Sequence, residues 1–152
     1  MAPLLKISDA TSLGLHAAVL LAQTKQGTVL TNRRIAKDLA VSEAHLSKVM
    51  QRLNRAGLVA SIRGPTGGFV LQNDPHHVSL LAVYEAIEGT WQAPECLLPQ
   101  KKCFKGCCLL GSFFDLMNQD AYGYFSKTML SDIPALFCTA DGIGPKKNRK
   151  HK

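Results

Sequence analysis

The chain has 152 residues, of which 46% are hydrophobic and 19% are charged, so its composition excludes an intrinsically disordered protein. The formal net charge is +7 and is unevenly distributed. Residues 25–72 hold eight Lys or Arg against two acidic residues, whereas residues 73–138 hold four against seven. A locally basic folded segment fits a polyanionic partner such as nucleic acid, although a solvated basic face that binds nothing has the same composition.

The N-terminal residues lack the basic region and apolar block of a secretory signal. The apolar run at residues 17–22 is too short to span a membrane. We therefore expect a cytoplasmic protein with no membrane partner. The five cysteines of such a protein are expected to be reduced thiols, metal ligands or redox groups rather than structural disulfides.

Apolar periodicity predicts three helices before residue 57. The first runs from about residue 9 to residue 24, and the second runs from about residue 32 to Ala40. After a tight junction, Ser42 is the expected N-cap of a third helix that ends near Arg55. The buried face of this third helix is expected to consist of Leu46, Val49, Met50 and Leu53.

A β-hairpin is predicted next, with strands at residues 58–63 and 69–71 and a glycine-rich turn between them. Ser79 is the expected N-cap of a fourth helix that runs to about residue 88. Residues 90–108 are expected to be irregular, and one long helix is predicted from residue 109 to about residue 132. The fold class is therefore mainly α with a small β-hairpin.

Two short helices joined by a tight turn and followed by a hairpin have the order of a winged helix-turn-helix domain, whose second helix enters the DNA major groove. Polar groups near the start of that helix can reach base edges, and an arginine at a slender hairpin tip can enter a narrow minor groove. Each feature alone is commonly solvated surface, but the three in this order rarely coincide by accident. The candidate DNA-contacting residues are Ala44, His45, Ser47, Lys48, Gln51, Arg52, Arg63, Gly64 and Thr66.

One stretch of the chain resembles the signature of the Rrf family of bacterial winged helix-turn-helix transcription regulators (the IscR, NsrR and CymR type): VSEAHLSKVMQRLNRAGLVASIRGPTGGFVL. The Arg-Gly-Pro-x-Gly-Gly-aromatic wing is specific to that family. The resemblance implies a homodimer that binds a double-stranded DNA operator, with the long C-terminal helix crossing to the partner. It also implies that Arg63 lies in the minor groove and that four residues face bases, namely Ala44, His45, Ser47 and Lys48.

Four cysteines lie within thirteen residues in the sequence C-x6-C-x3-C-C. Thiolates are soft ligands suited to iron–sulfur clusters or zinc, and the lysines nearby favour the thiolate form. The family resemblance implies that three of them hold an iron–sulfur cluster of the 2Fe–2S or 4Fe–4S type. The predicted ligands are Cys96, Cys103 and Cys108, with Cys107 as a substitute and Asp9 as a candidate fourth ligand.

These patterns divide the chain into a DNA-binding domain at residues 1–78, a sensor loop with dimerisation helices at 79–138, and a disordered basic tail at 139–152. The main hypothesis is a transcription regulator, and specifically a repressor, that senses cluster, redox or nitric oxide status. A metal-free thiol switch and a structural zinc site are alternatives. An enzyme is not expected, because no C-x-x-C, GxSxG, P-loop or GxGxxG motif is present.

Overall fold

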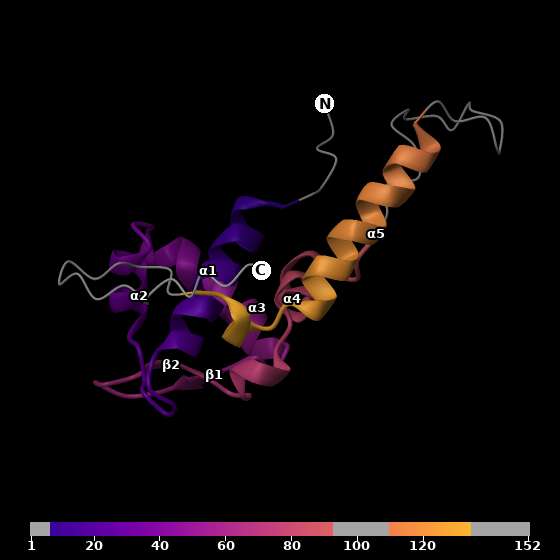
Figure 1. Ribbon diagram of the computed structural model, residues 1–152. Helices are drawn as coiled ribbons and strands as arrows, with labels where there is room; N and C mark the ends of the chain where they lie inside the picture. The colour runs from indigo at the N-terminus through magenta and orange to yellow at the C-terminus, as the bar shows by residue number, and fades with distance from the viewer. Residues whose placement is uncertain (1–6, 93–109, 135–152) are drawn as a thin grey trace.

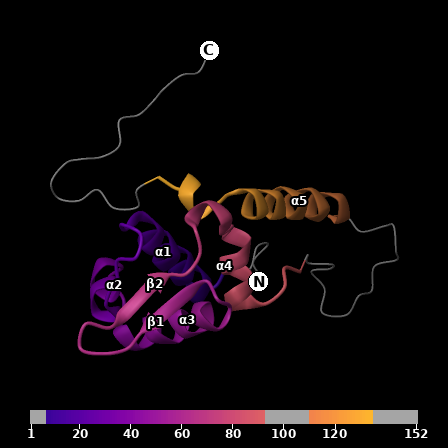
Figure 2. The ribbon, with the colours of Figure 1, turned by 90° about the horizontal axis from the view of Figure 1, so that it is seen from below.

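A computed structural model describes residues 7–92 and 110–134 of the chain. Helices α1 to α4 and a two-stranded hairpin form one body, from which helix α5 projects (Figures 1 and 2). This arrangement confirms the predicted mainly helical fold with a small hairpin. The elements in chain order are α1 (Asp9–Gln23), α2 (Asn32–Asp38), α3 (Glu43–Arg55), β1 (Val59–Ile62), β2 (Gly68–Leu71), the 3₁₀ turn η1 (Pro75–His77), α4 (Leu80–Glu88), α5 (Gly111–Lys127) and the 3₁₀ turn η2 (Leu130–Asp132).

Local side-chain caps fix where three of the helices begin. The hydroxyls of Ser8, Ser42 and Ser79 each accept a hydrogen bond from the backbone N–H three residues further on, at 3.1–3.2 Å. Each bond satisfies one of the donors that a helix N-terminus leaves free. Gly57 follows α3 and Gly89 follows α4, both with a positive φ that other residues rarely adopt. The predicted starts of α3 and α4 are thereby confirmed.

The hydrophobic core lies where α1, α3 and α4 meet, and it continues under α2 and β1. The apolar stripe predicted for the third helix is buried completely. Burial of each such side chain stabilises the fold by about 1.5–3 kcal/mol relative to exposure. The residues with no more than 2% of their surface exposed include Ala17, Ala18, Ile35, Leu46, Val49, Met50, Leu53, Val59, Val78, Val83 and Leu130.

The hairpin is attached to the rest of the body through the segment before α2. Strands β1 and β2 are antiparallel, with Val59 opposite Leu71 and Ile62 opposite Gly68. Leu30 forms a further antiparallel bridge with Phe69, whose two main-chain hydrogen bonds measure 2.9 and 2.8 Å. This isolated bridge holds the two-stranded wing against the segment before α2.

The prediction of one long helix from residue 109 to residue 132 was wrong at its C-terminal end. Helix α5 ends at Lys127, and Met129 then pairs with Ser79 in an antiparallel bridge flanked by two main-chain hydrogen bonds of 2.9 Å. Leu130, which is 1% exposed, follows this bridge into the core. The chain leaves the helix because these long-range contacts replace the hydrogen bonds that further helical turns would make.

An aromatic cluster joins α5 to α4. The ring of Trp91 lies 4.7 Å from that of Tyr84 and 5.4 Å from that of Phe125, measured between centroids. The Nε1 of Trp91 also donates a hydrogen bond of 2.8 Å to the Oδ1 of Asn118. Burial raises the pKa of the Tyr84 phenol, and the nearby carboxylates of Glu88 and Glu85 raise it further.

Candidate nucleic-acid interface

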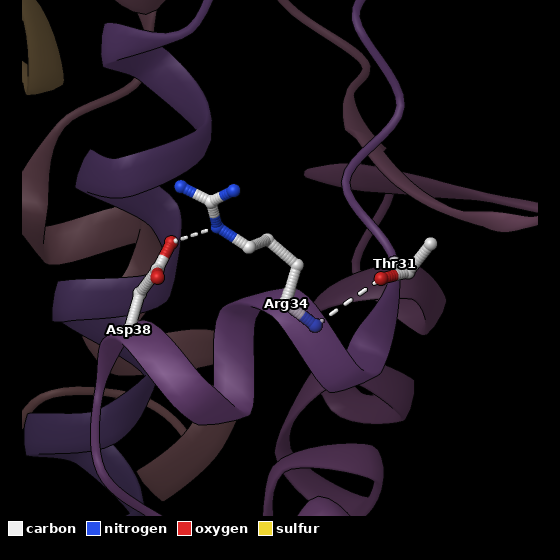
Figure 3. A network of polar contacts seen from close by, with 3 residues as sticks. All are labelled: Thr31, Arg34 and Asp38. Carbon is white, nitrogen blue, oxygen red and sulfur yellow. Dashed lines mark hydrogen bonds and ion pairs between the residues drawn. The ribbon is translucent and has the colours of Figure 1, made fainter.

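Helix α2 has seven residues and depends on contacts at both of its ends. Thr31 caps it, since its Oγ1 accepts a hydrogen bond of 3.1 Å from the backbone N–H of Arg34. The Nε of Arg34 then pairs with the Oδ2 of Asp38 at 2.8 Å, one turn further on (Figure 3). Such a short helix is marginal in isolation, and an exposed pair at this spacing contributes about 0.3–0.5 kcal/mol.

A tight turn fixes α3 relative to α2. Ala40 takes a left-handed conformation with a φ of 53°, so α2 ends at Asp38, two residues before the predicted end. The backbone N–H of Val41 donates to a carbonyl of α2 at 3.0 Å. The Nδ2 of Asn32 donates to the carbonyl of Glu43 at 3.1 Å, and so links the starts of the two helices. These contacts fix the orientation of α3 relative to α2, and the two helices form a helix-turn-helix.

The face of α3 opposite its buried stripe is open to solvent. Of the residues predicted to contact bases, Ala44, His45 and Lys48 are exposed, and Ser47 is half-buried. Gln51 is exposed one turn after Ser47. The structure thus brings these predicted residues together on one side of α3, with short groups near its start and a cation among them.

Beside α3, the turn between β1 and β2 projects from the body (Figure 2). Residues 61–66, which include the predicted Arg63, Gly64 and Thr66, are all exposed. Gly64 has a φ of 118°, and a Cβ on Gly67 would lie 2.4 Å from the carbonyl oxygen of Ile62. The tip can be this narrow only because these two positions carry no side chain. The structure thus presents one guanidinium at the end of a slender hairpin.

Arg52 differs from the other predicted residues because it has a partner within the protein. Its Nη1 donates a hydrogen bond of 3.3 Å to the main-chain carbonyl of Ile87, at the end of α4. Its side chain is thus directed toward α4. Whether it also contacts DNA stays a prediction.

Two cations on α2 were not among the predicted site residues. Arg33 and Lys37 are exposed, and they lie four residues apart on one face of the helix. In a helix-turn-helix the first helix crosses the phosphate backbone. The spacing of two cations four residues apart in this helix could therefore have predicted phosphate contacts. These two exposed cations on the first helix of the pair are further candidate phosphate contacts.

The predicted cluster ligands Cys96, Cys103, Cys107 and Cys108 lie outside the described residues. Asp9, the candidate fourth ligand, is the first residue of α1 and is exposed. Within residues 7–92 and 110–134, no three His, Cys, Asp or Glu side chains are grouped closely enough to hold a metal ion. None of the helices in these same ranges is long and apolar enough to cross a membrane.

The fold and this surface define a class: the chain is a winged helix-turn-helix, DNA-binding transcription regulator. Residues 7–135 match the model of the Rrf2 family, described as an iron-dependent transcriptional regulator, and the chain belongs to this family. Both the family and the similar proteins below are transcriptional regulators rather than enzymes. The resemblance seen in the wing and recognition segment is thus confirmed over most of the chain.

Three similar proteins illustrate the range of the family. A putative HTH-type transcriptional regulator of Aquifex aeolicus is 27% identical over 129 residues, covering 83% of this chain and 89% of the relative. The regulator NsrR of Bacillus subtilis is 32% identical over 92 residues, which cover 60% of this chain and 63% of NsrR. The structure of CymR, the global cysteine regulator of B. subtilis, superposes with a TM-score of 0.70 at 29% identity, covering 84% of this chain and 95% of CymR.

Proposed function

We propose that this protein is a homodimeric regulator that reads its operator with α3 and the wing, and that an iron–sulfur cluster controls this binding. The observation that carries the DNA-reading part is the exposed polar face of α3 beside an arginine-tipped hairpin on the same rigid body. In this proposal, residues 1–78 bind DNA, and residues 79–138 form the sensor and the dimer interface.

In the proposed complex, α3 lies in the major groove and the wing lies over the adjacent minor groove. The small side chains of Ala44 and Ser47 allow close approach to base edges, while His45, Lys48 and Gln51 supply hydrogen bonds. The guanidinium of Arg63 enters the minor groove, and the backbone of Gly64 and the hydroxyl of Thr66 contact the sugar–phosphate chain.

The homodimer is supported by the surface of α5. Several large apolar side chains along this projecting helix are exposed. An exposed apolar patch of this kind marks a surface that contacts another protein. Leu116 is 62% exposed, and Phe113 and Met117 lie beside it at helical spacing. A second copy of the chain packed along α5 would cover them. The exposed large apolar residues of the segment are Leu110, Phe113, Leu116, Met117, Tyr122 and Tyr124.

The cysteine donor set fits an iron–sulfur cluster, because three thiolates within thirteen residues are the ligands that such clusters prefer. We propose Cys96, Cys103 and Cys108 as ligands, with Cys107 or Asp9 completing the set. A bound cluster would supply a group that oxidants and nitric oxide alter. In the sequence, the cysteine segment connects Trp91, which packs at the α4–α5 junction, to the start of α5. The role of the protein would be to transmit a change at the cluster to these two helices.

A metal-free thiol switch is the second candidate, and the adjacent cysteines Cys107 and Cys108 favour it. In this case two thiols would form a disulfide, losing two electrons and two protons to an oxidant such as a peroxide. The similarity to CymR, the global cysteine regulator of B. subtilis, supports this second candidate.

The test begins with anaerobic purification and measurement of iron, acid-labile sulfide and zinc. Iron and sulfide in comparable amounts support the cluster, zinc without sulfide indicates a structural site, and a metal-free protein with reversible thiol oxidation favours the switch. Operator DNA is then selected from a random library. Alanine at Cys96, Cys103 and Cys108 together is expected to abolish the response of DNA binding to oxidant, whereas the control Cys138→Ala is expected to retain it. An unchanged response in the triple variant would refute the cluster.

A further inference from the structure

The C-terminal end of α4 lies between α1 and α3. Ile87, in the last turn of α4, is 8% exposed. A Cβ added to Gly14 of α1 would lie 2.1 Å from the Cδ1 of Ile87 and 3.3 Å from the Cγ1 of Val49 on α3. The three helices therefore meet at one point without room for an additional methyl group, so a shift of α4 there displaces its neighbours.

Two polar links join the same end of α4 to the neighbouring helices. The Nη1 of Arg52 on α3 donates to the carbonyl of Ile87 at 3.3 Å, and this carbonyl is among those that a helix C-terminus leaves unpaired. The Oγ1 of Thr11 on α1, which is fully buried, donates to the Oε1 of Glu88 at 2.6 Å, and the Oγ of Ser8 donates to the same oxygen.

Arg52 is exposed, and its position around α3 places it within reach of α4. An α-helix turns about 100° per residue, so Arg52 lies roughly 60° around α3 from Arg55. Arg55 is opposite the buried stripe that runs from Leu46 to Leu53, at the centre of the exposed face. Arg52 lies toward the edge of that face, on the side where α4 packs.

We infer that Arg52, which links α3 to α4, and Glu88, which links α4 to α1, are positioning residues: together they fix how α3 is held in the body and so determine DNA affinity without contacting DNA. The inference rests on the proposed use of α3 as the DNA-reading helix. The expected effects differ from those of direct electrostatics in the salt dependence for Arg52 and in the sign for Glu88. Loss of Arg52 weakens binding without the salt dependence of a lost phosphate contact, and loss of the negative Glu88 weakens binding rather than strengthening it.

The experiment measures the affinity of the full chain for operator DNA, selected from a random library, at several salt concentrations. Arg52→Ala and Glu88→Ala are each expected to weaken binding about tenfold, with the slope of log affinity against log salt unchanged. The matched control Arg55→Ala is expected to lower that slope by about one, as a lost phosphate contact does. Glu88→Gln keeps the acceptor oxygen and is expected to restore binding.

A decrease in the salt slope for Arg52→Ala equal to that of Arg55→Ala would overturn the inference, as would equal or tighter binding by Glu88→Ala. A second readout needs no DNA. Trp91, the single tryptophan, follows α4 by three residues, and its emission is expected to change in Arg52→Ala and Glu88→Ala but not in Arg55→Ala. If the unmodified chain binds no DNA, the proposed function fails, and unchanged Trp91 emission would separately refute the positioning role.

Discussion

Substitution of Gly68 by alanine tests how the wing is attached to the body. A Cβ at this position would lie 2.1 Å from the carbonyl oxygen of Leu30, 2.6 Å from its carbonyl carbon and 2.8 Å from the Cα of Thr31. All three are backbone atoms, so the strand must separate from Leu30 by about 1 Å or more to reach van der Waals distance. That movement breaks the two hydrogen bonds between Leu30 and Phe69.

Each of these hydrogen bonds contributes about 1 kcal/mol net to the free energy of unfolding. Alanine also lowers the backbone entropy of the unfolded chain, which offsets about 0.4–1 kcal/mol of that loss. We therefore expect Gly68→Ala to lower the free energy of unfolding by about 1–2 kcal/mol, measured by urea denaturation followed by circular dichroism. It should also weaken operator binding, because the wing tip loses its fixed position.

Gly123→Ala is the matched control. Gly123 lies inside α5 with nothing within 4 Å of the added Cβ, so alanine there should stabilise the helix by up to about 1 kcal/mol. If Gly68→Ala were as stable as the unmodified chain and bound operator equally well, the close approach of Leu30 would not be what requires glycine in the wing.

Three further changes have definite expected outcomes. Ala40→Gly should raise the free energy of unfolding by about 0.5 kcal/mol in urea denaturation, because glycine relieves the left-handed strain at φ 53°; a lower urea midpoint would contradict this. Thr11→Val removes a buried donor to Glu88 and should cost about 1–3 kcal/mol, and a thermal unfolding midpoint equal to that of the unmodified chain would show that the bond contributes little. Leu116→Lys, at a 62% exposed site on α5, should shift sedimentation from dimer to monomer with helicity retained, and a persisting dimer would place the interface elsewhere.

The sequence alone determined the features that depend on neighbours a few residues away. Ser42 begins α3 because its hydroxyl caps the third residue beyond it, and Gly57 ends α3 because it tolerates a positive φ. The buried stripe from Leu46 to Leu53 follows from helical periodicity, which is a property of the order of residues. The helix-turn-helix, the wing and the family were therefore readable before any coordinates.

The tertiary structure decided what depends on residues far apart in the chain. Helix α5 ends at Lys127 because Met129 pairs with Ser79, fifty residues earlier, and no local pattern near Met129 indicates that pairing. The direction of Arg52 was equally unpredictable, since a cation on an exposed helix face can meet either a phosphate or a carbonyl. Its partner at Ile87 exists only because packing in the core brings the end of α4 against α3, and such packing arises from the whole set of buried side chains.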